Sequence, residues 1–508
     1  MTESHRRGRR ALLSCEDKTG LEALAKGLVS LGWEIVSSGR TSAFLAEHGV
    51  EHSTVESVTG SPEMLGGRVK TLHPRIHGGI LADRSQPEHL DSLQEHGIAP
   101  IDLVVCNLYK FADRPGIETI DVGGPTMVRA AAKNHAHVAV LTDPGDYGAL
   151  LDELRRDGAV SEETRRRLAR KAFALTAAYD AAIVSWLDSE AGETLPPTIH
   201  LALERAQELR YGENPHQEGA RYRYAGGSSW WDSVTQHGGM ALSYLNMWDS
   251  EAAWRLVHDL GDRPAAAIIK HANPCGVGVA GDLAQAYRLA FECDEKSAFG
   301  GIVAVNGPLS AEVATEMVGA AQADIIIAPA FEEGSIAALA KKRKNTRLLE
   351  APAPSSDRLH FRQLGGGFLV QDPPRLEKTR SDWQVVSKVA PTEEEWADAE
   401  LAWRVCAHVR SNAVVLVKGG QAVGIGAGQQ SRVDSGEVAA RKAAGRARGG
   451  ASATDGFYPF RDGIDAAAEA GVAVVVQPGG SLRDDEVIAA ADEHGIALVM
   501  TGERQFLH

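Results

Sequence analysis

One local pattern recurs along this 508-residue chain and constrains its fold more than any other feature. A stretch rich in Ala, Leu and Glu ends at a glycine, and a short apolar run follows at once. The glycine suits the position just after a helix, and the apolar run is typical of a buried strand. The pattern occurs at residues 25–39, 43–55, 92–109, 466–480 and 490–502. It predicts an α/β fold with parallel or mixed sheets covered by helices, and ligand sites at the carboxyl ends of the strands.

The chain is too long for one hydrophobic core, and about three or four units are expected at this length. A polar, Pro-bearing segment at 190–197 predicts a linker, and further breaks are expected at 350–357 and 372–382. We therefore expect a first domain at 1–196 and a second region at 197–508, with lobes at about 197–370 and 371–508. No tandem repeat of 20 to 50 residues is visible, which excludes solenoids and propellers.

Composition excludes several classes of protein. Apolar residues make up 44% and charged residues 24%, as in globular enzymes. The 53 Lys and Arg against 68 Asp and Glu leave a net charge of −15, which argues against nucleic-acid binding, and the short basic run KKRK at 341–344 is expected to be a solvated helix face or loop. No apolar run is long enough to predict a membrane span, and no secretory leader is expected. Five scattered cysteines without CxxC spacing predict reduced thiols in a cytoplasmic protein, with no zinc site.

Two neighbouring strand ends near the N-terminus carry groups that suit an anion. A strand at 12–14 leads into CEDKTG and a helix at 21–31, and a strand at 34–37 leads into SSGRTS and another helix. Hydroxyls, a lysine and the free amides of helix starts favour a phosphate, although simple helix capping explains the same residues. The residues concerned are Ser14, Lys18, Thr19, Ser38, Gly39 and Thr41.

Two further segments of the first domain carry reactive side chains. The stretch GGRVKTLHPRIHGG at 66–79 is typical of an anion-binding loop, and a charged loop without function is the alternative. Its potential cations are Arg68, Lys70, His73, Arg75 and His77. NLYKF at 107–111 follows an apolar strand, and IDVGGPTMVRAAAKNH follows at 120–135. Together an Asp, a Tyr and two Lys suit deprotonation of an amide nitrogen and stabilisation of an oxyanion.

These motifs resemble, in order and spacing, the cyclohydrolase domain of the bifunctional purine-biosynthesis family that carries AICAR transformylase and IMP cyclohydrolase activities. The resemblance continues to the C-terminus through LRYGENPHQ, KHANPCGVG, SAFGGIVAVN, DIIIAPAF, SNAVVLVK, GIGAGQQSRVDS, DGFYPFRD and QPGGSLRDDEVI. It implies a methylglyoxal-synthase-like first domain, two cytidine-deaminase-like α/β lobes, and an intertwined homodimer with transformylase sites at the subunit interface.

KHANPCG carries the chemistry expected of the second region. Formyl transfer to a weakly nucleophilic amine needs a base for the amine and a proton for the departing folate nitrogen. His271 suits the base, Lys270 can assist proton transfer, and Asn273 can organise either group. In isolation, a surface Lys-His pair in a capped loop would be the simpler interpretation.

The resemblance also assigns residues to the two activities. For cyclisation it implies that Lys70 and Lys133 stabilise oxyanion charge and that Tyr109 and Asp121 handle protons; for formyl transfer it implies Lys270, His271 and Asn412, the last holding the formyl oxygen. It implies nucleotide contacts in the first domain at Ser14, Lys18, Ser38, Gly39, Thr41, Arg68, Thr71, Asn107, Gly123 and Gly124. In the second region it implies substrate contacts at Arg210, Tyr211, Phe299, Gly300, Asp324, Arg432, Asp455, Phe457 and Arg504.

Several positions depart from the family pattern. Glu16 stands where Ser is common, and Arg40 replaces the second Gly of Gly-Gly-Thr. An acid beside a bound phosphate is unfavourable without a cation, and Arg40 could supply it by pairing with Glu16 or with the phosphate. Lys110 replaces a Pro, and the link at 112–120 is shorter than usual. Lys296 and Gln505 depart in the second region.

The resemblance implies formyl transfer from 10-formyltetrahydrofolate to AICAR, then dehydrative closure of the product, FAICAR, to IMP. Two alternatives stay open: a paralogue acting on a purine-analogue nucleotide, and a nucleotide-binding protein with reduced turnover. The expected partners are small-molecule nucleotide and folate substrates and a second copy of the chain, without nucleic acid or membrane. No tightly bound metal is expected, and dependence on a monovalent cation is left open.

Overall fold

A computed structural model describes residues 8–109, 111–356 and 359–508. The chain divides into two compact units, the first running to Glu204 with Tyr224–Gly227 added, the second comprising Arg205–Arg223 and Ser228–His508. The domain boundaries expected near residues 196 and 370 stay predictions. Lys110 lies outside the described residues.

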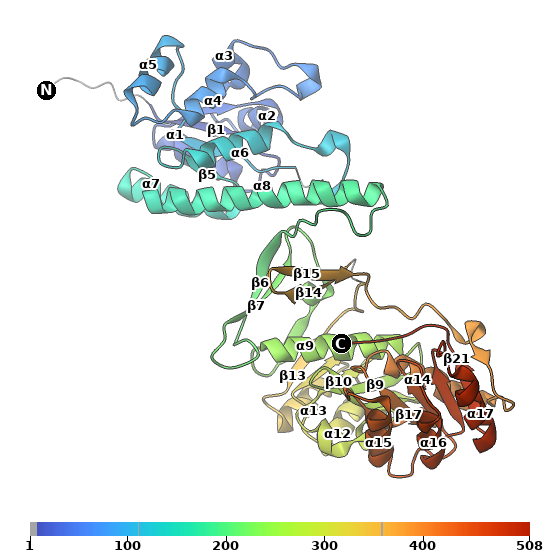
Figure 1. The fold of residues 1–508 in the computed structure, drawn as a ribbon. Coiled ribbons are helices and arrows are strands. Elements are labelled where there is room, and N and C mark those ends of the chain that lie inside the picture. Colours follow the sequence, from blue (N-terminus) through green and yellow to red (C-terminus); the bar gives the residue numbers. More distant parts are fainter. Residues whose placement is uncertain (1–7, 110, 357–358) are drawn as a thin grey trace. The chain divides into compact units, whose positions relative to one another are not determined.

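The first unit, coloured blue to green in Figure 1, is built on a five-stranded parallel sheet in the order β3-β2-β1-β4-β5. Its strands are β1 (Arg10–Leu13), β2 (Glu34–Ser37), β3 (Ser53–Thr54), β4 (Leu103–Val105) and β5 (Ala139–Leu141). Its helices are α1 (Leu21–Ser30), α2 (Gly39–Glu47), α3 (Val55–Thr59), α4 (Pro74–Leu81), α5 (Pro87–Glu95), α6 (Gly123–Lys133), α7 (Tyr147–Asp157) and α8 (Glu162–Glu190). The long helix α8 packs against α6 and β5.

The recurring helix–glycine–strand pattern is confirmed at four of its five places; after Gly49 the strand is only the short β3, whose two residues are exposed rather than buried. The glycines that close the five predicted helices all have positive φ, at Gly32, Gly49, Gly97, Gly471 and Gly495. The strand expected at 34–37 has those bounds, and the helix expected at 21–31 ends one residue earlier. The strand expected at 12–14 begins at Arg10 and ends at Leu13, so Ser14 is the first residue beyond it.

The strand order identifies the place on this sheet where ligands are expected to bind. From β1 the chain moves to β2 and β3 on one side and then returns to β4 and β5 on the other. The loops that follow β1 and β4 therefore leave the carboxyl ends of these strands in opposite directions, which opens a crevice between them. The segments after β1, β2 and β4 meet at this edge.

The second unit contains a 12-stranded sheet in the order β16-β21-β20-β19-β17-β18-β10-β9-β11-β12-β13-β8. The first lobe contributes β8 (Thr235–Gly238), β9 (Ala265–Lys270), β10 (Asn273–Val279), β11 (Ile302–Val305), β12 (Ile325–Ala328) and β13 (Arg347–Glu350). The second lobe contributes β16 (Gln384–Val385), β17 (Val414–Lys418), β18 (Gln421–Gly426), β19 (Ala451–Thr454), β20 (Val474–Gln477) and β21 (Ala497–Met500). Antiparallel pairing of β10 with β18, at Gly278 and Gln421, joins the lobes.

The two lobes repeat one arrangement of helices and strands (Figure 1). In each, a helix precedes a hairpin, and three strands follow with helices between them. The first lobe uses α9 (Tyr244–Asp259), α10 (Leu283–Cys293), α11 (Glu295–Ala298), α12 (Ala311–Gly319) and α13 (Ser335–Lys342). The second uses α14 (Glu393–Cys406), α15 (Arg432–Ala443), α16 (Asp462–Glu469) and α17 (Asp484–His494). This repeat is longer than the 20 to 50 residues of a solenoid or propeller unit. Whether the lobes are cytidine-deaminase-like stays a prediction.

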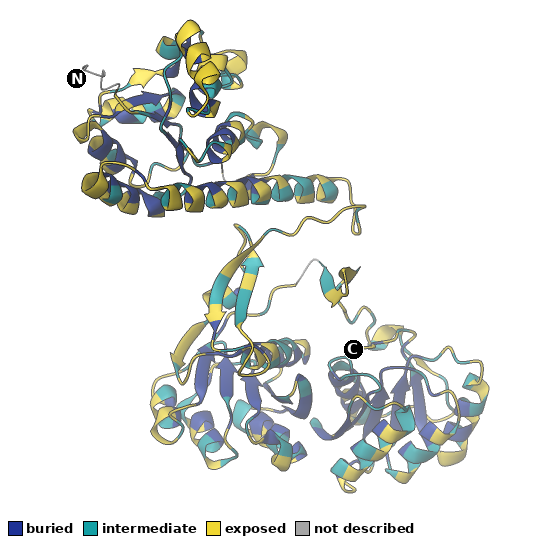
Figure 2. Cartoon of the chain, turned by 60° about the vertical axis from the view of Figure 1, so that its left-hand side comes forward, coloured by how far each residue is buried: buried dark blue, intermediate teal, exposed yellow. Residues whose placement is uncertain are grey.

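Helices cover both faces of the large sheet. Alternate residues of β9 enter different cores: Ala267 and Ile269 pack with Trp254 of α9, whereas Ala266 and Ile268 face α10 and α12. Trp254 and Trp403, on α9 and α14, are both fully buried in one core shared by the lobes. In Figure 2 the central strands of this sheet are buried and the outer helix faces are exposed.

Two small antiparallel hairpins remain: β6 (Leu203–Leu209) with β7 (Gly219–Tyr224), and β14 (His360–Leu364) with β15 (Gly367–Gln371). The second lies in the second unit, and the first has all but its outermost residues there. As predicted, the basic run at 341–344 lies at the exposed end of α13, except that Arg343 is half-buried and donates to carbonyls at the end of α12. Among the described residues, no helix is long and apolar enough to cross a membrane.

Candidate functional sites

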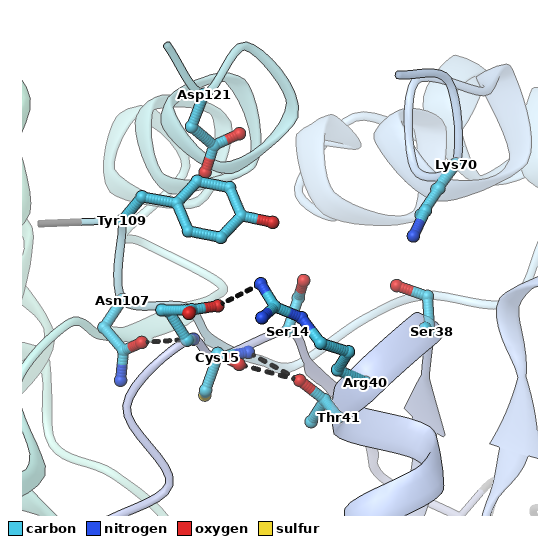
Figure 3. Close-up of a pocket in the computed structure, with 11 residues that line it drawn as sticks. Ser14, Cys15, Ser38, Arg40, Thr41, Lys70, Asn107, Tyr109 and Asp121 are labelled. Atoms are coloured by element: carbon cyan, nitrogen blue, oxygen red, sulfur yellow. Dashed lines mark hydrogen bonds and ion pairs between the residues drawn. The ribbon is translucent and has the colours of Figure 1, made fainter. Parts of the chain in front are cut away.

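A pocket opens in the first unit at the crevice between β1 and β4. It holds about 450 Å³ of free space, part of it open to solvent, and is lined from three strand ends and two further loops (Figure 3). Its lining residues are Ser14, Cys15, Glu16, Ser38, Gly39, Arg40, Thr41, Lys70, Asn107, Tyr109 and Asp121. The structure therefore brings together eight of the residues assigned from the sequence, at the edge of the sheet where ligands were expected.

Two of these residues build the wall of the pocket with their polar groups. Asn107 Oδ1 accepts hydrogen bonds from the amides of Glu16, at 2.6 Å, and Asp17, at 2.9 Å. The Thr41 hydroxyl accepts from the amide of Cys15 and donates to its carbonyl, at 3.0 and 2.9 Å. Because these amides and side chains are already paired, the loop after β1 is rigidly shaped but offers few donors of its own.

Other groups at the same end suit an anion: among the described residues two hydroxyls there are unpaired, whereas Lys70 Nζ already makes an ion pair of 3.1 Å with Glu63. Ser38 precedes α2, yet its side chain makes no capping hydrogen bond, which disfavours the simple capping explanation for this residue. In the part of the chain that the structure describes, the hydroxyls of Ser14 and Ser38 have no hydrogen-bond partner, and both face the pocket in Figure 3. Lys70 Nζ lies 3.0 Å from the position that a Cβ on Gly39 would take, so a side chain there would crowd the lysine. Two hydroxyls, a lysine and the start of α2 thus surround one space.

Arg40 reaches across the mouth of this space. Its guanidinium makes an ion pair of 2.7 Å with Glu16, which confirms the pairing considered from the sequence. The Cζ atom also lies 5.7 Å from the centre of the Tyr109 ring. A hydrogen bond with Tyr109 and the charge of Glu16 raise the pKa of Arg40. The two departures from the family pattern therefore compensate each other electrostatically.

Asp121 stands at the opposite end of the pocket, behind Tyr109 in Figure 3. Its Oδ1 accepts from the amide of Gly124 at 2.9 Å, and its own amide donates to the Tyr179 hydroxyl at 2.8 Å. Burial raises the pKa of Asp121, while the amides of Gly124 and Gly123 act in the opposite direction. A Cβ on Gly124 would lie 2.2 Å from Asp121 Oδ2, so only glycine fits there.

Several residues assigned to this site lie away from the pocket lining. Lys18 Nζ donates to the carbonyls of Cys15 and Glu16, and burial lowers its pKa. Arg68 pairs with Glu118 at 2.5 Å, and Lys133 is exposed at the end of α6. Of the five potential cations at 66–79, only Lys70 lines the pocket. Thr71 is buried, and its Oγ1 lies 3.2 Å from where a Cβ on Gly123 would be.

In the second unit, Lys270 and His271 occupy the tight turn between β9 and β10. His271 has φ 54° and Ala272 has φ 56°, a left-handed conformation that costs roughly 1–2 kcal/mol for each non-glycine residue. Lys270 Nζ donates to the carbonyl of Phe299. Asn273 Nδ2 donates to the His271 carbonyl at 3.2 Å, and its Oδ1 accepts from the amide of Arg410 at 3.0 Å. Asn273 thus organises the turn, as the sequence suggested.

The sequence did not single out Asp249, a half-buried carboxylate of α9. Its Oδ1 accepts from the amide of Ala272 at 2.8 Å. Burial raises the pKa of Asp249, and the amides and positive charges of the Lys270–His271 turn oppose that rise. No local motif marks this residue.

A first cluster of assigned residues lies in the first lobe. The guanidinium of Arg210 lies over the Tyr211 ring, 4.8 Å from its centre, and donates to the Tyr211 hydroxyl at 2.9 Å. A Cβ on Gly300 would lie 3.3 Å from Lys270 Nζ and 3.9 Å from Asp324 Oδ1. Phe299 is 62% exposed beside them.

The buried Arg347 supports this first cluster and was missed in the sequence. Its guanidinium donates to the carbonyl of Ala241, and its amide donates to the carbonyl of Asp324 at 3.0 Å. The next carbonyl, that of Leu242, accepts from the amide of Arg210. Arg347 is the first residue of β13, and no motif in the sequence marks it.

A second cluster lies in the second lobe. Arg432 forms an ion pair of 2.9 Å with the fully buried Asp455 and donates to the Phe457 carbonyl at 3.1 Å. Asn412 Nδ2 donates to the carbonyls of Gln429 and Gln430. Arg504 lies over Phe506. The hydrogen bond from Arg410 to Asn273 connects this lobe's 410–412 segment with the His271 turn.

All five cysteines are free and buried. Burial raises the pKa of each thiol, to about 11 for Cys15 and about 12 for Cys275 and Cys293. Within residues 8–109, 111–356 and 359–508, no group of three or more His, Cys, Asp or Glu residues is arranged to hold a metal ion.

Comparisons with known proteins cover nearly the whole chain. The MGS-like domain matches residues 20–134, and the AICARFT/IMPCHase bienzyme matches residues 131–442. "Bifunctional purine biosynthesis protein PurH" of Roseobacter denitrificans is 49% identical over 98% of this chain and 99% of its own. The protein of the same name from Myxococcus xanthus is 50% identical over 98% of this chain and 100% of its own. A solved structure, "Crystal structure of ForH", is 40% identical, covering 36% of this chain and 100% of its own, with a TM-score of 0.34. The chain therefore belongs to the AICARFT/IMPCHase bienzyme family and begins with an MGS-like domain.

Proposed function

We propose that this chain catalyses two successive steps of purine biosynthesis. It transfers the formyl group of 10-formyltetrahydrofolate to the 5-amino group of AICAR, and it closes the product, FAICAR, to IMP with loss of water. The observation that carries the proposal is the match over 98% of the chain to proteins named bifunctional purine biosynthesis proteins. The family match supports 10-formyltetrahydrofolate as co-substrate.

Cyclisation is assigned to the first domain, 1–196. The phosphate of FAICAR would bind at Ser14, Ser38 and the start of α2, where free hydroxyls and amides meet. The carboxamide nitrogen attacks the formyl carbon, and Lys70 stabilises the oxyanion that forms. Tyr109 and Asp121 exchange the protons that leave the nitrogen and that depart with water.

Formyl transfer is assigned to 197–508. His271 accepts a proton from the 5-amino group as its nitrogen attacks the formyl carbon, and Lys270 assists protonation of the departing folate nitrogen. Arg210, Tyr211 and Asp324 would hold the nucleotide. Asn412 and Arg432 lie in the other lobe, and we propose that a second copy of the chain completes each site as a homodimer.

A paired spectrophotometric assay tests this function. Purified protein is mixed with AICAR and 10-formyltetrahydrofolate, and release of tetrahydrofolate and formation of IMP are followed separately. Both products are expected. Tetrahydrofolate without IMP would contradict the assignment of the first domain, and release of neither would contradict the proposal as a whole.

The Glu16–Arg40 pair gives a specific expectation for the cyclisation site. Replacing Arg40 by Gly leaves the Glu16 carboxylate unpaired beside the phosphate, so KM for FAICAR should rise about 10-fold, the equivalent of about 1.4 kcal/mol. In the double variant Glu16→Ser/Arg40→Gly, the repulsion is removed, and KM should return to within about 3-fold of the wild-type value.

Arg156→Ala is the matched control, because Arg156 makes a comparably exposed ion pair with Asp157 on the same unit but lies outside the pocket lining. It should leave the KM for FAICAR unchanged. An unchanged KM in Arg40→Gly would show that the pair does not face the bound phosphate.

A further inference from the structure

The turn that carries His271 has a counterpart in the second lobe. The β9–β10 turn joins Lys270 to Asn273, and the β17–β18 turn joins Lys418 to Gln421. Both central residues of each turn have positive φ: 54° and 56° at His271 and Ala272, and 61° and 79° at Gly419 and Gly420. Positive φ at both central positions is the requirement of a type I′ hairpin turn.

Both turns are held by an aspartate from the preceding helix. In the second lobe, the two oxygens of Asp398 on α14 accept from the amides of Gly419, at 2.9 Å, and Gly420, at 3.0 Å. In the first lobe, Asp249 on α9 accepts from the amide of Ala272 at 2.8 Å. Each aspartate precedes a buried Trp, which is followed by an Arg, by the same spacing, Asp249 before Trp254 and Asp398 before Trp403. The contact therefore belongs to the repeated architecture.

The turns differ in the residues that adopt the left-handed conformation. Glycine accepts positive φ without a steric penalty, so the Gly419–Gly420 turn is favoured even without the carboxylate. His271 and Ala272 carry Cβ atoms that disfavour this conformation. The β9–β10 turn consequently depends on its aspartate more than the β17–β18 turn does. The strained turn carries the imidazole of His271.

We propose that Asp249 is a positioning residue for formyl transfer. It holds the left-handed β9–β10 turn, and through the turn it keeps the His271 imidazole where the attacking amine is deprotonated. The inference rests on the proposed function of His271. Asp249 acts through the turn and does not touch substrate.

Substitutions in the full-length protein test this role. Asp249→Ala should lower kcat for formyl transfer about 30-fold, because displacement of a catalytic group by about 1 Å has effects of this order. The KM values for AICAR and 10-formyltetrahydrofolate should change less than about 3-fold, since the nucleotide contacts are unaltered. Asp249→Asn, which keeps one acceptor oxygen, should lose less than about 5-fold in kcat.

Rescue distinguishes positioning from a general structural effect. Adding Ala272→Gly to Asp249→Ala should restore kcat to within about 3-fold of the wild type, because glycine favours the turn without the carboxylate. Asp398→Ala is the matched control: it removes the same kind of contact from the glycine turn and should leave kcat for formyl transfer within about 2-fold of the wild type.

Three results would overturn the proposal: unchanged kcat in Asp249→Ala, an equal loss in Asp398→Ala, or no rescue by Ala272→Gly. Thermal unfolding of the same variants separates this inference from the proposed function. Asp249→Ala should lower Tm less in the Ala272→Gly background than in the wild type, whatever reaction the protein catalyses. If the wild type lacked formyl transfer, the proposed function would be wrong. Equal Tm losses in both backgrounds would instead show that Asp249 does not stabilise the β9–β10 turn.

Discussion

Replacing His271 by alanine is expected to lower kcat for formyl transfer about 10³-fold, within the range that a positioned general base contributes. The imidazole stands on a turn held by Asn273 and Asp249, which fixes the base relative to the reacting amine. Without it, the 5-amino group must lose its proton to solvent as it attacks the formyl carbon. Cyclisation of supplied FAICAR should be unchanged, because no residue assigned to that reaction lies in this unit.

Separate initial-rate assays of the two reactions measure this effect. His494→Ala is a suitable control, because His494 bonds to Asp465 at 2.7 Å on the other lobe and is assigned no role. Formyl transfer at the wild-type rate in His271→Ala would contradict the assigned base. Equal losses in both reactions would point to misfolding, which circular dichroism checks.

The second large effect is expected at Asp121. The isosteric change Asp121→Asn should lower kcat for cyclisation about 10²-fold or more, because the amide cannot accept a proton, and should leave formyl transfer intact. Burial raises the pKa of Asp121 above its ordinary value of 3.8. A base must be deprotonated to act, so the wild-type rate should fall as pH decreases through this raised pKa, above the range of an ordinary aspartate.

The pH dependence of kcat for cyclisation, measured with wild type and Asp121→Asn, tests this assignment. The acidic limb should disappear from the residual activity of the variant. Asp143→Asn provides a control, because the pKa of Asp143 is instead lowered by its ion pair with Lys171. Persistence of the limb in Asp121→Asn would assign it to another group.

Much of the fold followed from local sequence chemistry. The glycines after the helices mark positions where the backbone becomes left-handed, and the apolar runs after Gly32 and Gly495 form the buried strands β2 and β21. The strand order then accounts for the place of the first pocket, because the segments after β1 and β4 had already been identified as polar.

The sequence could not show which hydrogen-bond partner each polar side chain has. Lys18 was expected to face a phosphate, but its ammonium group bonds to two carbonyls of its own loop. Asn107 lines the pocket, yet its side-chain amide is hydrogen-bonded to the backbone of Glu16 and Asp17. These choices depend on contacts between segments far apart in the chain.

Asp249 is a residue whose role the sequence did not reveal. A single aspartate within an amphipathic helix has no motif, and its importance depends on the turn that lies against it in space. The repeated spacing of Asp and Trp-Arg on α9 and α14 was visible in the sequence, but its meaning required the knowledge that both helices pack beside equivalent hairpins.

Mixing His271→Ala with Asp121→Asn shows whether two separate sites perform the two reactions in sequence. AICAR and 10-formyltetrahydrofolate are added, and IMP formation is measured. The mixture should form IMP at a rate far above that of either variant alone, because one variant supplies FAICAR and the other closes it. A mixture that forms no more IMP than the separate variants would contradict the assignment of the two reactions to separate sites.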